Sequence, residues 1–371
     1  MGTPILDSLE IRGFCGFRQL QIERLGRVNL IVGKNNVGKS SLLEALQLYA
    51  CRGHPRIIWE ILKTRGEIIF PSFDRPDLKE PDIADMLLAL KYLFYGRKDV
   101  RTHLEPMQLG SMNTPEKILY VSVDRYTEQE DKFGIPRWNL VEPEAYDTFD
   151  NLVPRFTVDL GRYFQVSYPF KADAAALRMG TWKLLIEIPH AFVTGDGLSA
   201  DEIVAMWPET VKLKEELFGA VRIIAPGVEG LAREDESGME RTPMLKIKGI
   251  DEPLSLRSLG EGMRRVLGIA AALVNARNGF LLIDGFENGL YYFAQVDLWR
   301  LIFQAAHRFN VQVFATTHSW DCIEGFQKAA QEDNQDEGLL IRLEYKRGDV
   351  VVTLFDERQL GIATRERIEV R

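Results

Sequence analysis

The chain has 371 residues, of which 46% are hydrophobic and 27% charged, and its formal net charge is −8 at pH 7. This length suits one large α/β domain or a core domain with an insertion, and no apolar run approaches the roughly 18 residues of a membrane-spanning helix. The acidic balance argues against a protein that coats nucleic acid nonspecifically, although a local basic patch would still make nucleic acid possible.

The first residues lack the basic start and the apolar block of a secretory signal, and the three cysteines are scattered along the chain. We therefore expect a cytoplasmic protein that does not enter a membrane. The histidines and cysteines show no metal-ligand spacing, so no structural zinc site is expected. The only metal that we expect is Mg²⁺, bound together with a nucleotide.

A strand, a glycine loop and a helix are predicted near the start of the chain. The run RVNLIV predicts a short buried strand, and the run after the loop carries leucines at near-helical spacing. Between these runs, Gly33, Gly38, Lys39 and Ser40 match the Gly-x-x-x-x-Gly-Lys-Ser spacing of the Walker A motif.

This loop has the chemistry of a phosphate site. Its glycines let successive backbone N–H groups face phosphate oxygens, and the N-terminus of the following helix adds about half a positive charge. Lys39 is expected to neutralise the β- and γ-phosphates of ATP, and the Ser40 hydroxyl to hold Mg²⁺. The neighbouring residues that we also assign to nucleotide binding are Asn35, Asn36 and Ser41.

Residues 51–215 predict an insertion of mixed α and β structure, in which prolines separate the pieces. The predicted helices are 56–65 and 82–95, and the predicted strands are 118–123, 156–160, 164–170 and 182–189. No heptad pattern is sustained, so a long coiled-coil arm is not expected. A further helix begins after Ser199, because Ser199 and Glu202 have capping-box spacing.

The α/β alternation resumes in residues 216–371. The predicted helices are 263–277 and 294–308, the predicted strands are 280–284 and 311–315, and a hairpin is predicted over 340–345 and 350–355. We therefore assign residues 1–50 and 216–371 to one nucleotide-binding domain, which the insertion at 51–215 interrupts.

Two further segments have properties of a nucleotide site. Asp284 ends a predicted buried strand, and an acid in this place reaches Mg²⁺ beside the phosphate loop of P-loop enzymes. Ser258, Gly260 and Glu261 open a predicted helix, where exposed N–H groups and the helix dipole favour an anion. Taken alone, this second segment is better explained as an ordinary capped helix start.

The order of these segments resembles the heads of ABC-type ATPases, the group that includes RecF-like and structural-maintenance-of-chromosomes (SMC) proteins. Four motifs follow one another along the chain: a Walker A loop, a Ser-x-Gly-Glu helix start, a Walker B strand and Thr-Thr-His-Ser. Runs such as NNVGKSSLLEAL, IDGFENGL and FATTHSWDCIEGF are similar to those of the OLD-family (AAA-15/AAA-21-like) ATPases. The resemblance covers about residues 1–50 and 220–371. It implies an α/β P-loop NTPase of ABC-ATPase type, with a mixed α+β insertion between the Walker A and signature segments.

In that family two heads sandwich two ATP molecules, so ATP acts as a dimerisation switch. The resemblance implies a homodimer through the ATP sites, with a higher assembly possible, in which Ser258 and Gly260 meet the γ-phosphate held by the partner's P-loop. It also implies that His318 is the switch histidine that contacts the γ-phosphate, and the alternative is an ordinary polar residue at a strand end. The family's middle glutamine is left unassigned, with Gln108 as one candidate.

One departure from the family concerns the residue after the Walker B aspartate. These families usually place a glutamate there to orient the attacking water, and this chain has Gly285. Glu287, two residues further on, could orient the water instead only if the loop after Asp284 turned. The alternative is that Glu287 positions this loop, which the resemblance places facing the dimer partner. Tyr291 stands where the family often has histidine. Since phosphoryl transfer relies on positioning and charge neutralisation, we expect slow hydrolysis with intact ATP binding, and His318 and Glu287 are the candidate catalytic residues.

A second departure is that no acid cluster of a Toprim nuclease follows the last predicted head strands. If the ATPase gates an effector, that effector is expected to be a separate protein, docked on the insertion or on the outer face of the heads. The resemblance also implies a setting, because family members of this size often belong to prokaryotic anti-phage defence systems.

Two other functions stay open. In a DNA-processing ATPase of RecF/SMC type, hydrolysis would drive a DNA clamp, and basic residues such as Arg264 and Arg265 would face DNA. The alternative for these arginines is a solvated or dimer-facing helix surface. A small-molecule kinase would use the same P-loop, but it explains neither the segment 258–262 nor His318.

Overall fold

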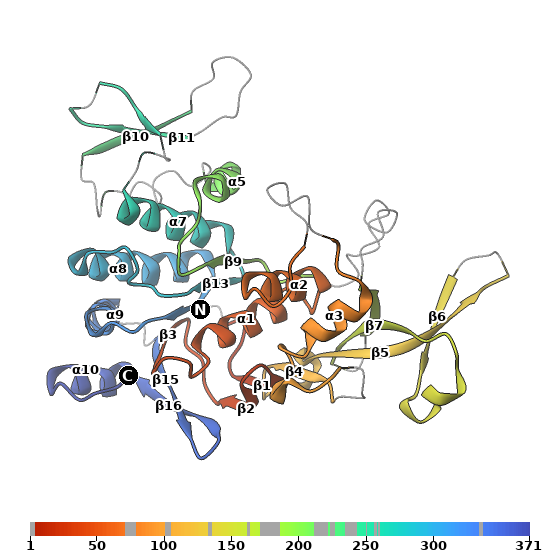
Figure 1. Ribbon diagram of the computed structural model, residues 1–371. Helices are drawn as coiled ribbons and strands as arrows, with labels where there is room; N and C mark the ends of the chain where they lie inside the picture. The colour runs from red at the N-terminus through yellow and green to blue at the C-terminus, as the bar shows by residue number, and fades with distance from the viewer. Residues whose placement is uncertain are drawn as a thin grey trace.

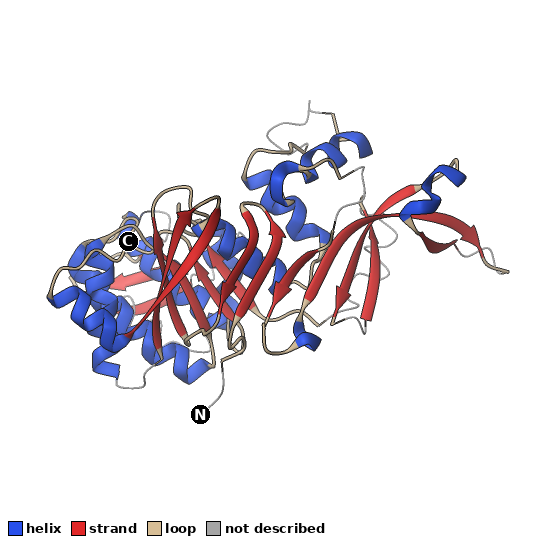
Figure 2. Cartoon of the chain, turned by 90° about the horizontal axis from the view of Figure 1, so that it is seen from below, coloured by secondary structure: helices blue, strands red, loops and turns tan. Residues whose placement is uncertain are grey.

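Two large β-sheets dominate the computed structural model (Figures 1 and 2). The described residues are 4–70, 79–100, 105–132, 136–161, 164–170, 186–210, 222, 227–233, 243–249, 251–255, 258, 260–333 and 337–371. Within them, one sheet is mainly parallel, one is antiparallel and a third, three-stranded sheet is small. Figure 2 shows the strands of the two large sheets side by side, with helices packed around them.

The mainly parallel sheet contains β3 (Val28–Gly33), the strand that directly precedes the phosphate loop. Its other strands are β9 (His190–Val193), β13 (Phe280–Ile283), β14 (Gln312–Thr316), β15 (Gly338–Lys346) and β16 (Asp349–Asp356). They lie in the order β16-β15-β3-β14-β13-β9, and only the outermost strand β16 is antiparallel to its neighbour in this described part. Every residue of β3 and β13 is buried, because helices and the second sheet cover both faces.

Helices pack on both faces of this sheet, and the two faces have separate cores. The helices are α1 (Lys39–Ala50), α5 (Ala200–Thr210), α7 (Glu261–Asn275), α8 (Tyr292–Phe309), α9 (Trp320–Asp333) and α10 (Glu357–Arg365). On β3, Leu30 lies in the same buried cluster as Leu298 of α8, whereas Ile31 lies in the cluster of Leu42 of α1. This alternation follows from the two-residue period of a strand. Figure 1 shows α7, α8, α9 and α10 stacked along one side of the molecule.

The antiparallel sheet joins the start of the chain to the insertion. Its strands are β1 (Leu9–Phe14), β2 (Phe17–Ile22), β4 (Met107–Gly110), β5 (Leu119–Glu130), β6 (Pro136–Val141), β7 (Val153–Leu160) and β8 (Phe164–Pro169). The described strands lie in the order β2-β1-β4-β5-β7-β8, and β6 pairs with β5. Because Ile11 of β1 pairs with Leu109 of β4, the insertion continues the sheet that the N-terminal hairpin begins.

The remaining elements are short. The helices are α2 (Pro55–Thr64), α3 (Ile83–Leu90), η1 (Tyr95–Arg97), η2 (Pro115–Lys117) and η3 (Pro143–Thr148), and the strands of the small sheet are β10 (Val228–Arg233), β11 (Pro243–Ile247) and β12 (Leu254–Ser255). No helix among the residues described above has the length and apolarity that would let it cross a bilayer.

Most elements predicted from the sequence are confirmed, with two exceptions in the insertion. The helix predicted over 82–95 ends as α3 at Leu90, because Phe94 turns away to form a β-bridge with Phe14 and Gly96 has a φ of 76°. The strand predicted over 182–189 falls partly outside the described residues, its last four residues are not a strand, and β9 starts only at His190. The capping box of α5 is confirmed, since the Ser199 hydroxyl accepts the Glu202 N–H at 3.2 Å.

The division of the chain at residues 50 and 215 stays a proposal, and two elements bear on it. The strand β9 and the helix α5 lie within the insertion by sequence. Nevertheless β9 pairs with β13 in the mainly parallel sheet, and α5 packs on α7, where Asn275 donates a hydrogen bond to the Met206 carbonyl at 3.3 Å. In space, the end of the insertion therefore contributes to the layer that holds the Walker B strand.

Candidate functional site

The phosphate loop connects β3 to α1 and has the strand–loop–helix context that its sequence predicts. Gly38 caps α1 with a φ of 105°, a conformation that residues with a side chain rarely adopt. A Cβ atom on Gly38 would also lie 2.7 Å from the ring of Phe17 on β2. No side chain caps the first turn of α1, so its N–H groups are available to an anion.

Lys39 is the first residue of α1, directly after this loop. Its ammonium group donates hydrogen bonds to the carbonyls of Gly33, at 2.7 Å, and Lys34, at 2.9 Å. Burial lowers the pKa of Lys39, while the nearby charges of Asp284 and Glu287 act in the opposite direction. A phosphate oxygen of a nucleotide would replace the two carbonyls as partner of this partly desolvated cation.

Ser40 and Asp284 come together as a pair of oxygen ligands suited to Mg²⁺. The Ser40 hydroxyl donates to Asp284 Oδ2 at 2.8 Å, and the Thr316 hydroxyl donates to Asp284 Oδ1 at 2.5 Å. Neighbouring ligands of an octahedral Mg²⁺ lie about 3.0 Å apart when each metal–oxygen distance is about 2.1 Å. The two oxygens therefore lie close to the separation that the ion requires, and both could bind Mg²⁺ once the Ser40 hydroxyl no longer donates its proton to Asp284.

His318 and Glu287 also lie beside this site. Both carboxylate oxygens of Glu287 hold the segment after β14: Oε1 accepts the His318 N–H at 2.8 Å, and Oε2 accepts the Thr317 hydroxyl at 2.8 Å. Burial, and next the charge of Lys39, lower the pKa of His318. Both effects favour the neutral imidazole, which can donate one hydrogen bond to a phosphate oxygen.

A cavity of about 780 Å³ opens above the phosphate loop, a volume in the usual range for small-molecule sites. Residues 35–41, Asp284 and His318 line it. Sequence reasoning missed the rest of its described lining, which consists of Cys15, Gly16, Arg65, Tyr92, Arg97, Tyr345 and Val350. These residues come from four separate segments, and their types fit the base and sugar of a nucleotide because they offer aromatic faces and cations.

Arg65 forms part of the floor of this cavity. Its guanidinium makes two hydrogen bonds to the Glu44 carboxylate, one of them from Nε to Oε1 at 2.9 Å, and a third to the Ser41 hydroxyl at 3.2 Å. Burial raises the pKa of Glu44, and the pairing with Arg65 opposes that rise. The pair thus ties α1 to the end of α2 just below the phosphate loop. In the sequence, the only indication of this ion pair is that Glu44 is a carboxylate within the leucine-rich helix α1.

The proposed signature segment lies elsewhere. Ser258, Gly260 and Glu261 are exposed, and none of them is among the described residues that line the cavity above the phosphate loop. Gly260 caps α7 without a side-chain hydrogen bond, and the Ser258 hydroxyl donates to the Ser255 carbonyl at 2.8 Å. Gln108, the candidate for the family's middle glutamine, lies on β4 and is also absent from that lining.

Arg265 does not have the surface position that the sequence suggested, whether facing DNA, solvent or a partner. Its side chain is 3% exposed, and its guanidinium donates to the carbonyls of Thr194, Asp284 and Gly285 at 2.5, 2.8 and 2.7 Å. The reason is the loop after β13: Gly285 has a φ of 60°, which turns consecutive carbonyls toward α7 and leaves them in need of a donor. Arg264, its neighbour, is half-buried.

Two family models match the chain. A model described as "AAA ATPase domain" matches residues 5–56, and one described as "AAA domain, putative AbiEii toxin, Type IV TA system" matches residues 198–321. An "ATP/GTP phosphatase" of Helicobacter pylori is 24% identical over 355 residues, which is 88% of this chain and 89% of that protein. An uncharacterised protein of Methanocaldococcus jannaschii is 34% identical over 92 residues, which is 24% of this chain and 76% of that protein.

Solved structures of SMC heads are also similar to this chain. An SMC head bound to the C-winged helix domain of ScpA has a TM-score of 0.49 and 13% identity, over 95% of this chain and 98% of that one. An SMC head domain from Thermotoga maritima has a TM-score of 0.42 and 13% identity, over 94% and 98%. The phosphate loop, the aspartate beside it and the family models on either side of the insertion support an ABC-type ATPase of the OLD, RecF and SMC-like group.

Proposed function

We propose that two copies of this chain dimerise around ATP and Mg²⁺ and act as a cytoplasmic switch for a separate effector protein. The observation that carries this proposal is the divided site. The phosphate loop, Asp284 and His318 share one cavity, whereas Ser258 and Gly260 are exposed outside it at an uncapped helix start. A second copy would bring that helix start to the γ-phosphate and complete the site.

Hydrolysis in this switch is expected to be slow. Gly285 supplies no side chain where related ATPases have glutamate, and both oxygens of Glu287 are engaged by the His318 segment. Among the described residues that line the cavity, Asp284 is the only carboxylate, and it is bonded to Ser40 and Thr316. Without a free carboxylate to orient water, ATP would persist in the dimer long enough to hold an effector in one state.

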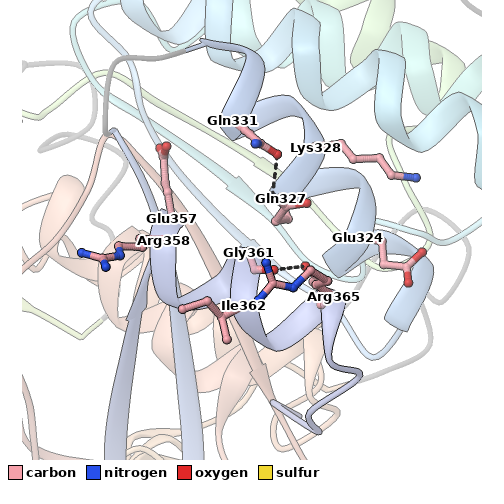
Figure 3. Close-up of a pocket in the computed structure, with 10 residues that line it drawn as sticks. Glu324, Gln327, Lys328, Gln331, Glu357, Arg358, Gly361, Ile362 and Arg365 are labelled. Carbon is pink, nitrogen blue, oxygen red and sulfur yellow. Dashed lines mark hydrogen bonds between the residues drawn. The ribbon is translucent and has the colours of Figure 1, made fainter.

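Two surfaces are suited to an effector. The insertion exposes Leu140 and Phe149, which are 42% and 45% exposed. The second surface is a groove of about 750 Å³ between α9 and α10, on the outer helical layer. Figure 3 shows charged side chains of both signs around this groove. A setting in prokaryotic anti-phage defence is part of this proposal, and the family model for residues 198–321 names a putative toxin of a toxin–antitoxin system.

The test measures molar mass by light scattering and ATP turnover in the same samples of the purified chain. We expect a Mg²⁺- and ATP-dependent dimer that turns over ATP no faster than Lys39→Ala, and we expect Ser258→Arg to abolish the dimer. A chain that stays monomeric with saturating ATP, or that hydrolyses ATP briskly, would contradict the proposal.

A DNA-processing ATPase is the second candidate, because both family models fit it equally well. One observation favours it: a further cavity of about 710 Å³ on the antiparallel sheet is lined by Arg12, Arg18 and Lys98. Arg12 pairs with Glu10, and Arg18 pairs with Asp349 at 2.5 Å, so part of this charge is already neutralised. ATPase activity that DNA stimulates at low salt and that falls as salt is raised would support this candidate.

A further inference from the structure

The groove between α9 and α10 has a glycine in its lining and charged side chains around it. Its volume is about 750 Å³, and Figure 3 shows the residues that line it. Ile362 is 44% exposed, so an apolar side chain is also available there. We call this site the α9–α10 groove and define it by Glu324, Gln327 and Lys328 of α9 and by Arg358, Gly361 and Ile362 of α10.

Gly361 lies in the middle of α10, where the fold of the chain does not require a glycine. Its φ is not positive, so its backbone suits any residue. A Cβ atom there would lie 3.4 Å from Gln327 Nε2, which is an ordinary contact with the end of a flexible side chain. Glycine destabilises the interior of a helix relative to alanine. The missing side chain is therefore best explained by an occupant of the groove that approaches the backbone of α10 closely.

The charges that stay unpaired in the groove are positive. Each glutamate in the lining already accepts a hydrogen bond at 2.8 Å, Glu324 from an indole N–H and Glu357 from a backbone N–H. Lys328 and Arg358 are exposed, and Figure 3 shows them on either side of Gly361. Neither cation forms an ion pair with any residue that the structure describes. An occupant with carboxylates would supply the missing partners.

These features favour a protein helix over nucleic acid. Nucleic acid is bound by clustered lysines and arginines, whereas this groove carries charges of both signs. A helix that lies along two neighbouring helices packs its side chains into the groove between them, with anchors at i, i+3, i+4 and i+7. Apolar anchors would contact Ile362, and acidic residues beside them would meet Lys328 and Arg358.

We propose that an acidic amphipathic helix of the effector protein docks in the α9–α10 groove and crosses α10 at Gly361. The inference rests on the proposed function, which requires a separate effector. The position suits a switch, because α9 begins at Trp320, two residues after His318. A partner bound along α9 thus contacts the helix that directly follows the candidate γ-phosphate contact.

The experiment measures by fluorescence anisotropy how two labelled peptides of about 18 residues, five helical turns, bind the purified full chain. One peptide has leucines on one helical face and glutamates on the other, and the second has lysine in place of each glutamate. The groove variants are Lys328→Glu with Arg358→Glu, and Gly361→Met. The control is Lys63→Glu with Lys79→Glu, which makes the same change in net charge at exposed positions of the insertion.

We expect wild type to bind the glutamate peptide at least about 10-fold more tightly than the lysine peptide. The charge reversal and Gly361→Met should each weaken binding of the glutamate peptide by about 10-fold or more, whereas the control should bind it as wild type does. Gly361→Met should unfold at the temperature of wild type or above it, because methionine is the better helix former. Its loss of binding would then come from the filled groove and not from unfolding.

The outcomes separate this inference from the function on which it rests. Light scattering with ATP and Mg²⁺ tests the dimer on the same preparations, and a monomeric wild type that still selects the glutamate peptide would refute only the proposed switch. Equal binding of both peptides, binding of neither at about 0.5 mM, or unchanged binding by Gly361→Met would overturn the inference. So would a charge reversal that lowers the molar mass of the assembly, which would assign the groove to a second copy of this chain, or one that abolishes binding of labelled duplex DNA.

Discussion

Replacing Gly285 with glutamate would restore the side chain that related ATPases place after the Walker B aspartate, and the structure predicts that this change is poorly tolerated. Gly285 has a φ of 60°, and a Cβ atom there would lie 2.5 Å from Asn288 Nδ2. The Asn288 amide donates to the Gly195 carbonyl at 2.9 Å, so moving it breaks a hydrogen bond. The left-handed conformation costs about 1–2 kcal/mol and the lost bond about 1 kcal/mol. We expect Gly285→Glu to lower the free energy of unfolding by about 2–3 kcal/mol.

Urea unfolding and ATP turnover, measured on the same preparations, test this prediction. Gly285→Ala is the matched control, because it meets the same strain without a carboxylate. In Asn288→Ala the displaced amide is absent, so adding Gly285→Glu to it should cost about 1 kcal/mol less than adding it to wild type. Turnover should rise more in that double variant than in Gly285→Glu alone. A Gly285→Glu variant within about 0.5 kcal/mol of wild type that hydrolyses ATP briskly would refute the strain argument.

Three further predictions concern the cavity above the phosphate loop. The pKa of His318 is lowered in the free chain and a bound γ-phosphate would raise it, so ATP binding takes up a proton. Calorimetry should therefore show tighter binding as the pH falls from about 7.5 to about 6, and a His318→Gln variant with the same pH profile would contradict this. Arg65→Met leaves the Glu44 carboxylate unpaired and should lower the free energy of unfolding by about 2 kcal/mol, which is less than for a fully buried pair. The double variant Arg65→Met/Glu44→Gln should recover part of this loss, as thermal unfolding would show. Asp284→Asn should bind ATP equally well with and without EDTA, whereas wild type should lose affinity on chelation; equal losses in both would remove Asp284 from the metal site.

The parts of the site that the sequence predicted are those whose geometry is local. The phosphate loop is one contiguous run between a strand and a helix, so its residue spacing alone specifies how Lys39 and Ser40 are placed. Asp284 was predictable for a related reason: the ends of neighbouring parallel strands meet at one edge of a sheet, so an acid after β13 has to lie near the loop after β3.

The parts that the sequence did not predict depend on long-range contacts. Arg65 is separated from Glu44 by 21 positions, and neither residue type reveals its partner. Arg265 has the spacing of an ordinary exposed helix residue, and it is buried because Gly285 presents carbonyls to it. The strand β9 has four residues of only alternate burial, too few to show a period, so its place beside β13 follows from pairing and not from pattern.

The shared antiparallel sheet limits how this protein can vary. The insertion cannot be removed or exchanged as a whole, because its strand β4 pairs with one edge of β1. This edge lies next to the Cys15–Gly16 turn, which lines the cavity above the phosphate loop. A shortened chain without β4 would expose a row of unpaired N–H and C=O groups there, a template for aggregation. Changes in length are therefore best tolerated in the strands beyond β4, such as the hairpin of β5 and β6, which can lengthen or shrink while the edge of β1 stays covered.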